Sequence, residues 1–323
     1  MKKLFKFLLL IVFIIAGYLA FALLVPVQVH EQRFVLLRPG SSARAIARQL
    51  QQGHVIRSWP AFLLFHYYKV RPLQAGEYLF NHSANALQVY KRIASGDVYV
   101  RTVVIPEGYN LFEIGQAVEA AGLGSSRDFE NIARHESALI ADLDPQAQSL
   151  EGYLFPNTYN FTRTQSLHDV TATMVRRFRQ EARALGLTQD VHRIVTLASI
   201  VEKETGAPDE RPLVASVYSN RLEHGMGLYA DPTVVYAALL AGRYRGTLFQ
   251  SDLQFKSPYN TYRFRGLPPG PIANPGRASL QAAMHPAESD FLYFVSDNNG
   301  RHRFARTATE HGRNVALYRK AQH

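Results

Sequence analysis

The segment Val191 to Thr205 reads VHRIVTLASIVEKET, and as a helix it is apolar around most of its circumference. Its polar residues form one stripe, made by His192, Thr196, Ser199 and Lys203. A helix with so little polar surface cannot face water on most of its sides. The segment therefore predicts a largely buried helix inside a folded domain.

Two carboxyls lie near the end of this helix, at Glu202 and Glu204. At about 100° per residue they point about 200° apart, so at most one of them acts as the acid on a given substrate atom. Glu204 has Ile200 one turn and Leu197 two turns before it, and such apolar neighbours raise the pKa of a carboxyl towards the working pH. The alternative from spacing alone is that one Glu pairs with a neighbouring basic residue and the other faces water.

Further along the chain, Asp231-Pro232-Thr233 is typical of a helix start, with Asp231 as the N-cap and Pro232 at the first helical position. A cap at the edge of a cleft can also touch a substrate, so Asp231 is a candidate for both roles. We expect residues 149–323, which are rich in aromatic and helical segments, to form a mixed α+β catalytic domain.

Two loops of this domain combine rigid turns with aromatic rings and an amide. They are Ser257 to Tyr262, SPYNTY, and Gly266 to Ile272, GLPPGPI. Loops of this composition bind sugars through ring stacking and directed hydrogen bonds. The alternative is that the tyrosines only cover an edge of the core.

Upstream of this domain, two segments share a pattern. A β-rich run leads to Arg38-Pro39-Gly40 in the first and to Ile105-Pro106-Glu107-Gly108 in the second, and helical apolar spacing follows each. We expect small α+β modules, similar to LysM folds, at residues 26–100 and 101–148. Such modules either bind glycan or lift the catalytic domain off a membrane.

The first residues predict the location of the chain. Residues 7–25 form an uncharged apolar run that is long enough to cross the ~30 Å hydrocarbon core once as a helix. Lys2, Lys3 and Lys6 precede it, so residues 1–6 are expected to be a cytoplasmic tail and the rest extracytoplasmic. A cleaved signal peptide ending at Ala20-Phe21-Ala22 is the alternative, although its apolar region is usually shorter.

Composition narrows the classes of partner and chemistry. The 323 residues contain 36 Lys and Arg against 26 Asp and Glu, which suits a polyanion. Export argues against nucleic acid and leaves anionic lipid or a wall polymer. The chain has no cysteine, no His-Glu-x-x-His, no Gly-x-Ser-x-Gly and no phosphate-binding glycine loop, so we expect no metal and no cofactor.

Five blocks of sequence occur in an order known from one family. They are EGYLFP from Glu151, ASIVEKET from Ala198, DPT from Asp231, YNTY from Tyr259 and GLPPG from Gly266. With these blocks the chain resembles the MltG (YceG-like) endolytic murein transglycosylases over essentially its whole length. It departs from the family at Asn157, where Asp is common, and at Tyr229-Ala230, where Gln and Ser or Thr are usual.

The resemblance implies a peptidoglycan enzyme of the inner membrane. Its reaction would be cleavage of MurNAc–GlcNAc bonds within glycan strands without addition of water, which leaves 1,6-anhydro-MurNAc ends and ends strand elongation. Peptidoglycan strands would be the substrate and peptidoglycan synthases possible partners. The alternatives are a hydrolytic muramidase, with Asp231 or Glu151 as the second carboxylate, and a non-catalytic wall-binding scaffold.

Matching the blocks residue by residue makes Glu204 the catalytic acid/base. The resemblance makes Glu202 a supporting residue. The candidates for substrate binding, Glu202 included, are Glu151, Tyr153, Glu202, Asp231, Tyr259, Asn260 and Tyr262.

Overall fold

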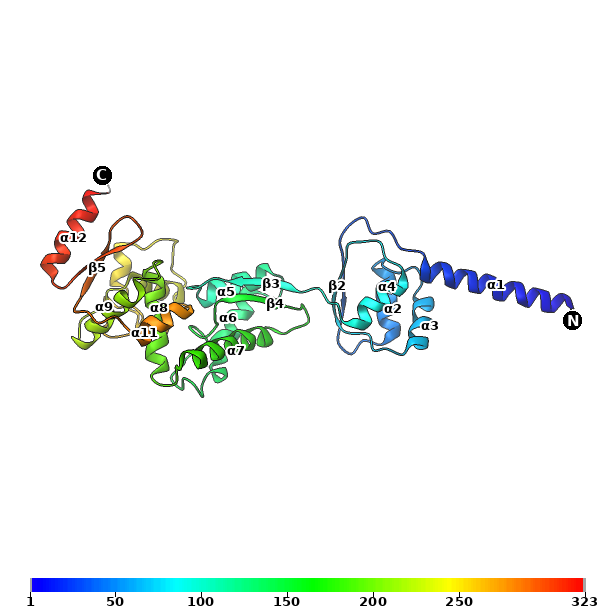
Figure 1. The fold of residues 1–323 in the computed structure, drawn as a ribbon, viewed down its shortest axis with the longest axis horizontal. Coiled ribbons are helices and arrows are strands. Elements are labelled where there is room, and N and C mark those ends of the chain that lie inside the picture. Colours follow the sequence, from blue (N-terminus) through cyan, green and yellow to red (C-terminus); the bar gives the residue numbers. More distant parts are fainter. Residues whose placement is uncertain (1, 322–323) are drawn as a thin grey trace. The chain divides into compact units, whose positions relative to one another are not determined.

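The computed structural model describes residues 2–321, and they form two compact units. Unit 1 comprises the residues up to Thr102 together with Asn160–Ser166. Unit 2 comprises Val103–Tyr159 and the residues from Leu167 onwards. Helices and short strands occur in both units (Figure 1), which confirms the predicted mixed α+β class with an N-terminal apolar helix.

Unit 1 begins with the apolar helix and continues as a small α+β body. Its elements are α1 (Lys2–Leu24), β1 (Arg33–Leu37), α2 (Ala43–Gln52), α3 (Trp59–Lys69), β2 (Gly76–Phe80) and α4 (Ala86–Ser95). Strands β1 and β2 are antiparallel, with Arg33 opposite Phe80 and Leu37 opposite Gly76. A Cβ atom at Gly76 would lie 2.2 Å from Val98 Cγ1, so only glycine fits where β2 begins.

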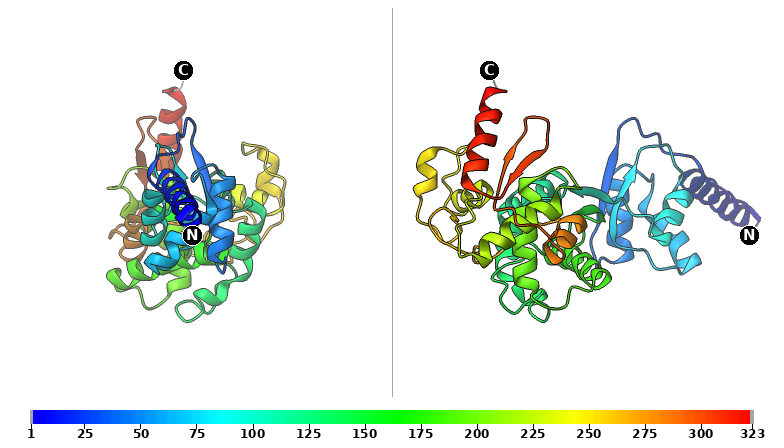
Figure 2. Two further views of the ribbon diagram at one scale, coloured as in Figure 1. Left: turned by 90° about the vertical axis from the view of Figure 1, so that its right-hand side faces the viewer. Right: turned by 60° about the vertical axis from the view of Figure 1, so that its left-hand side comes forward.

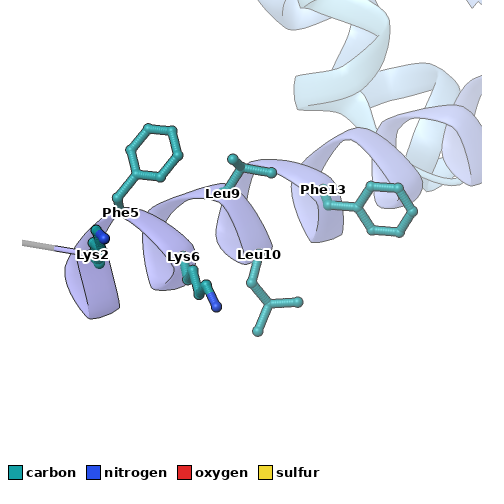
Figure 3. A pocket seen from close by; sticks show the side chains of 6 residues that line it. All are labelled: Lys2, Phe5, Lys6, Leu9, Leu10 and Phe13. Carbon is teal, nitrogen blue, oxygen red and sulfur yellow. The ribbon is translucent and has the colours of Figure 1, made fainter.

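The first helix differs from the rest of the unit in its exposure. By length and composition α1 is the single helix among residues 2–321 that could cross a bilayer. Figure 3 shows its first turns, where Phe5, Leu9, Leu10 and Phe13 project away from the backbone and Lys2 and Lys6 stand near its start. The last turn is different, because Ala22 is buried against the body of unit 1.

Unit 2 is mainly helical. It contains α5 (Leu111–Ala120), α6 (Ser126–His135), η1 (Ser137–Leu139), α7 (Leu167–Leu185), α8 (Val191–Glu204), α9 (Arg211–Glu223), α10 (Asp231–Leu240), η2 (Gln250–Gln254), α11 (Arg277–Met284), β5 (Tyr293–Ser296), β6 (His302–Ala305) and α12 (Ala308–Lys320). The antiparallel hairpin β5–β6 contacts α12, as Figure 2 shows.

The two remaining strands, β3 (Arg101–Ile105) and β4 (Asn157–Phe161), pair with each other, and the division between the units passes through both. From Val103 on, the segment 101–148 belongs to the same compact unit as α8. Pairing of β3 with β4, which lies after residue 149, is one reason for this grouping. The other is a set of hydrogen bonds around Asn274, described below.

Helix α8 is the buried helix that the pattern of Val191 to Thr205 predicts, and it contacts α9, α10 and α11. The polar stripe lies partly inside the core, since Thr196 and Ser199 are fully buried. Ser199 donates its hydroxyl to the carbonyl of Thr196 (2.7 Å) and accepts from the Ile272 amide (3.1 Å). Within the stripe, Ser199 therefore fixes the loop before α11 to α8, while Lys203 is exposed.

Candidate active site

Glu204 is the last residue of α8 and is half-buried. The hydroxyl of Tyr218, on α9, donates to its Oε1 atom at 2.7 Å. Tyr218 itself is 2% exposed, and its ring packs edge-on against Phe294 at 5.8 Å. The carboxyl is thus held at one oxygen by a buried donor while the side chain remains accessible to a ligand.

The electrostatic surroundings of Glu204 favour its protonated form. Burial is the main cause that raises the pKa of this carboxyl to about 7, and the negative charge of Asp231 adds to the rise. The Tyr218 hydroxyl and the Arg221 guanidinium act in the opposite direction. A carboxyl with a pKa near 7 can give up and take back a proton at neutral pH, as general acid–base catalysis requires.

Asp231 and Tyr262 form the part of the site next to Glu204. The Tyr262 hydroxyl donates to Asp231 Oδ1 at 2.6 Å, and the charge of Glu204 contributes to raising the pKa of Tyr262. The prediction that Asp231 is an N-cap is wrong: α10 begins at Asp231, and Ala230 occupies the cap position. The carboxylate of Asp231 is therefore free of the capping role and exposed.

A second layer of hydroxyls joins the start of α10 to the loop 257–262. The Thr233 and Thr261 hydroxyls lie 2.9 Å apart, and Thr261 Oγ1 accepts from the Ala230 amide at 3.0 Å. Both threonines are buried. This contact positions Asp231 and Tyr262 relative to each other.

Asn260 lies at the centre of this loop and is fully buried. Its side-chain amide donates to the carbonyls of Leu253 (3.1 Å) and Phe255 (2.7 Å), and its Oδ1 accepts from the Tyr262 amide (2.9 Å). The structure therefore uses the Asn260 amide to fix its own loop. Next to the loop, Tyr229 of the segment before α10 is half-exposed, and its ring lies 5.3 Å from the half-buried Tyr262 ring.

Glu202 points away from Glu204, as the helical spacing predicts, and lies in a different environment. Its Oε1 pairs with Arg211 at 3.1 Å, and its Oε2 accepts from the Gly276 amide at 2.8 Å. Its side chain is 5% exposed. Glu202 therefore ties α8 to the first residue of α9 and to the start of α11.

Glu151 is buried in a separate cluster of unit 2 and is 2% exposed. It accepts from the Leu111 amide (3.0 Å) and from the Asn274 side chain (2.8 Å), and the Tyr236 hydroxyl is a third donor. Burial raises its pKa to about 7, against the effect of these donors. Tyr259, half-buried, is close enough that the Glu151 charge helps to raise its pKa.

Asn274 is the residue that joins this cluster to the segment before α5. It exchanges two backbone hydrogen bonds, with Gly108 and Tyr109, each 2.9 Å long. Its side chain also accepts from the Leu154 amide at 2.8 Å. Because Asn274 is fully buried, these bonds make residues 103–110 part of the frame of unit 2.

Tyr153 is fully buried, and its hydroxyl donates to Asp144. Asp144 also contacts His192 Nδ1 at 2.8 Å, while His192 Nε2 lies 3.0 Å from the Pro269 carbonyl. This chain of contacts connects the start of α8 with the GLPPG loop. Tyr153 is thus placed in the core, apart from the Glu204 carboxyl.

Four partners of the predicted residues carry no signal in the sequence: Tyr218, Arg221, Tyr236 and Asn274. Tyr218 could have been found only by pairing its helix with the end of α8, since it lies 14 positions after Glu204. Within residues 2–321 no group of three or more His, Cys, Asp or Glu side chains is arranged to hold a metal ion.

The class that the fold and this site define is a mixed α+β protein in which one buried helix ends in an accessible carboxyl with a raised pKa. The chain belongs to the YceG-like family, whose model matches residues 35–317. It is 34% identical to a Bacillus subtilis protein named endolytic murein transglycosylase, over 92% of this chain and 88% of that one. A Streptococcus pneumoniae protein of the same name is 28% identical over 91% of this chain, which spans 60% of that relative.

A solved structure supports the same grouping. The crystal structure of a yceG-like protein from Listeria monocytogenes matches with a TM-score of 0.57 and 33% identity. The match covers 88% of this chain and 99% of the listerial chain.

Proposed function

We propose that this chain is an endolytic murein transglycosylase in which Glu204 is the single acid/base. The observation that carries the proposal is the half-buried Glu204 carboxyl, with Tyr218 on one oxygen and a pKa raised to about 7. The names of the bacillary and streptococcal relatives supply the substrate class, the glycan strands of peptidoglycan.

The reaction follows from one carboxyl that is protonated first and charged afterwards. Tyr218 occupies Oε1, so Oε2 carries the proton and donates it to the glycosidic oxygen as the bond from C1 of MurNAc to that oxygen breaks. The Glu204 carboxylate then takes the proton of the muramoyl 6-hydroxyl while O6 bonds to C1. The product is a 1,6-anhydro ring, and Glu204 ends protonated as it began.

Asp231 and Tyr262 suit the step in which positive charge develops on the sugar. An exposed carboxylate beside the acid stabilises an oxocarbenium-like centre through its negative charge. The half-buried ring of Tyr262 and the half-exposed ring of Tyr229 offer faces for sugar stacking. Asn260 and Glu202 act as positioning residues, because their polar atoms are bonded within the protein.

Glu151 suits a positioning role more than the second carboxylate of a hydrolase. It is 2% exposed and holds the first residue of α5 and the Tyr236 side chain of α10. Tyr153 has the same character, since it is buried against Asp144. In a hydrolytic mechanism the exposed Asp231 would have to activate water instead.

We further propose that α1 is a single-pass anchor in the cytoplasmic membrane, with both units outside. Lys2, Lys3 and Lys6 before the apolar run favour that orientation. The order β1, α2, α3, β2 supports a LysM-like module at residues 26–100, as a glycan-binding part or as a spacer. Peptidoglycan synthases are the partners that termination of growing strands would require.

The test is mass analysis of products from purified peptidoglycan strands with the full chain. We expect 1,6-anhydro-MurNAc ends and internal cuts, both abolished in Glu204→Gln and retained in Glu119→Gln, an exposed control on α5. Reducing MurNAc ends, heavier by one water, would instead identify a hydrolase. Binding of strands without new ends would identify a scaffold.

A further inference from the structure

Four exposed large apolar side chains of unit 1 fall within residues 64–70. We call them the α3 face: Leu64, Tyr67, Tyr68 and Val70. Tyr68 is 77% exposed and Val70 79%, which exceeds Phe13, at 76%, in the bare helix α1. An apolar cluster this exposed on a folded module marks a surface that another phase or molecule covers.

The backbone at Val70 adds a second observation. Val70 ends α3 in the left-handed conformation, with φ 51° and ψ 35°. Glycine or asparagine normally takes this position, because a β-branched side chain is strained there. The strained side chain is not compensated by packing inside unit 1, since it is exposed. What valine provides at this position is an apolar group at the surface.

The α3 face lies at the end of unit 1 where α1 leaves it. Leu23 packs against the core of unit 1, and the Arg57 guanidinium lies 4.9 Å from the centre of the Phe21 ring. Arg57 also donates to the Pro26 carbonyl at 2.9 Å. Helix α1 contacts α3, and Figures 1 and 2 show α3 on the edge of unit 1 from which α1 departs.

These contacts fix the height of the unit relative to a bilayer. If α1 spans the hydrocarbon layer, the lipid headgroups meet the chain near Leu24, where α1 ends. Because α1 joins unit 1 through packed side chains, the elements around this end are held at headgroup level. Tyrosine is a residue that membrane proteins place at this level.

The distribution of charge along the chain also suits a surface that faces an anionic membrane. Residues 26–102 contain ten Lys or Arg and three Asp or Glu, whereas residues 103–323 contain 23 of each kind. The excess positive charge outside the tail thus lies entirely in the part next to α1. Lys69 and Arg71 flank Val70, and the Lys69 ammonium lies 5.1 Å from the Tyr68 ring centre. Exposed aromatic and basic residues together are typical of surfaces that bind anionic lipid.

We propose that the α3 face seats unit 1 on the outer surface of the membrane. The tyrosines and Val70 would enter the headgroup layer, while Lys69 and Arg71 contact anionic lipid phosphates. This inference rests on the proposed anchor role of α1. It makes unit 1 a fixed base on the bilayer.

The chain has no cysteine, so a single introduced cysteine can be labelled specifically and gives a direct test. Tyr68→Cys carries an NBD fluorophore on the full chain, reconstituted in phosphatidylcholine vesicles with roughly one phosphatidylglycerol in three lipids. Asp97→Cys is the control, since it is exposed and follows α4 at the start of the segment leading to β3. A spin-labelled lipid is the quencher.

We expect the label at position 68 to show blue-shifted emission and quenching at least about twofold stronger than the label at position 97. Lys69→Glu with Arg71→Glu should reduce that difference, whereas Arg38→Glu with Lys91→Glu, an equal change of charge outside the α3 face, should not. Equal quenching at both positions in chains that float with vesicles would overturn the seating while leaving the anchor intact. Chains that do not float would overturn both.

Two further results would also contradict the proposal. One is a blue shift at position 68 produced by soluble wall polymer and not by vesicles. The other is crosslinking of position 68 to a membrane protein in cells, without lipid quenching in vesicles.

Discussion

Glu204 and Glu151 are two carboxyls of unit 2 with a pKa raised to about 7, and burial is the main cause for both. Their partners differ. Glu204 has Tyr218 on one oxygen and is half-buried, whereas Glu151 is almost fully buried and has three donors, from α5, from α10 and from the loop before α11. A raised pKa alone therefore does not identify the acid. The accessible carboxyl can exchange a proton with a substrate, and the enclosed one holds the frame.

The largest expected effect is that of Glu204→Gln. The amide keeps an oxygen for Tyr218 but cannot donate and retake the proton, so cleavage should fall by a factor of about 10² to 10⁴. The measurement is the rate of 1,6-anhydro end formation, with the melting temperature as a check on folding. A variant that keeps more than a tenth of the activity would remove Glu204 from the mechanism.

Glu151→Gln should affect stability more than chemistry. In the variant, the NH₂ group of the new glutamine would face one of the donors that now bond the carboxyl. A buried donor left without an acceptor lowers the free energy of unfolding by about 1–3 kcal/mol. The folded-state pKa is raised from 4.5 to about 7, so the stabilisation from this group is complete below pH 4.5 and is lost as pH rises through 7. Between pH 4.5 and about 7, the melting temperature of the unmodified chain should therefore fall more than that of Glu151→Gln.

The control for this variant is the pH dependence of its remaining activity. If Glu151 is a positioning residue, the alkaline limb of kcat/KM stays where Glu204 sets it. If Glu151→Gln folds normally but loses the alkaline limb, then Glu151 is the group whose protonation controls the reaction, and Glu204 is not.

Much of the fold could be predicted because it depends on local patterns. The apolar run at α1 and the nearly all-round apolar pattern of α8 each identify an element without knowledge of its neighbours. The apolar i−4 and i−7 neighbours of the residue that ends α8 make it a candidate acid, but they leave a structural role open. The match of the block ASIVEKET to one family is what singles it out.

The partners could not be predicted, because they depend on which helices meet. Tyr218 reaches Glu204 from α9, and Asn274 reaches Glu151 across 123 positions of sequence. The role of the Asn260 amide could not be predicted for a different reason, since nothing in the spacing of its loop reveals that the amide bonds the loop itself. Asp231 lies one position after the cap, because α10 begins at Asp231 and Ala230 takes the cap position.

Tyr218→Phe should have a smaller effect than Glu204→Gln or Glu151→Gln, and it tests how Tyr218 affects the Glu204 carboxyl. The hydroxyl lowers the pKa of Glu204, so its removal should raise that pKa and move the alkaline limb of kcat/KM to higher pH. Loss of the hydrogen bond should also reduce the rate at pH 6 by about tenfold. An unchanged limb would show that Tyr218 does not contact the acid in the working enzyme.

Asp231→Asn should have the smallest effect, and it should shift the pKa of Glu204 in the direction opposite to Tyr218→Phe. The negative charge of Asp231 raises the pKa of Glu204, and asparagine removes the charge while keeping an oxygen for the Tyr262 hydroxyl. The pKa of Glu204 should fall, so the alkaline limb of kcat/KM should move to lower pH, by less than about one unit. At pH 7 a smaller fraction of Glu204 is then protonated, and the oxocarbenium-like centre loses a nearby negative charge, so the two effects together lower activity by about a few-fold. If Asp231 were the base of a hydrolase, the same variant would lose nearly all activity at every pH, because no group would activate water. The shape of the pH profile, measured beside that of Tyr218→Phe, therefore decides whether Asp231 tunes the acid or takes part as a second catalytic carboxylate.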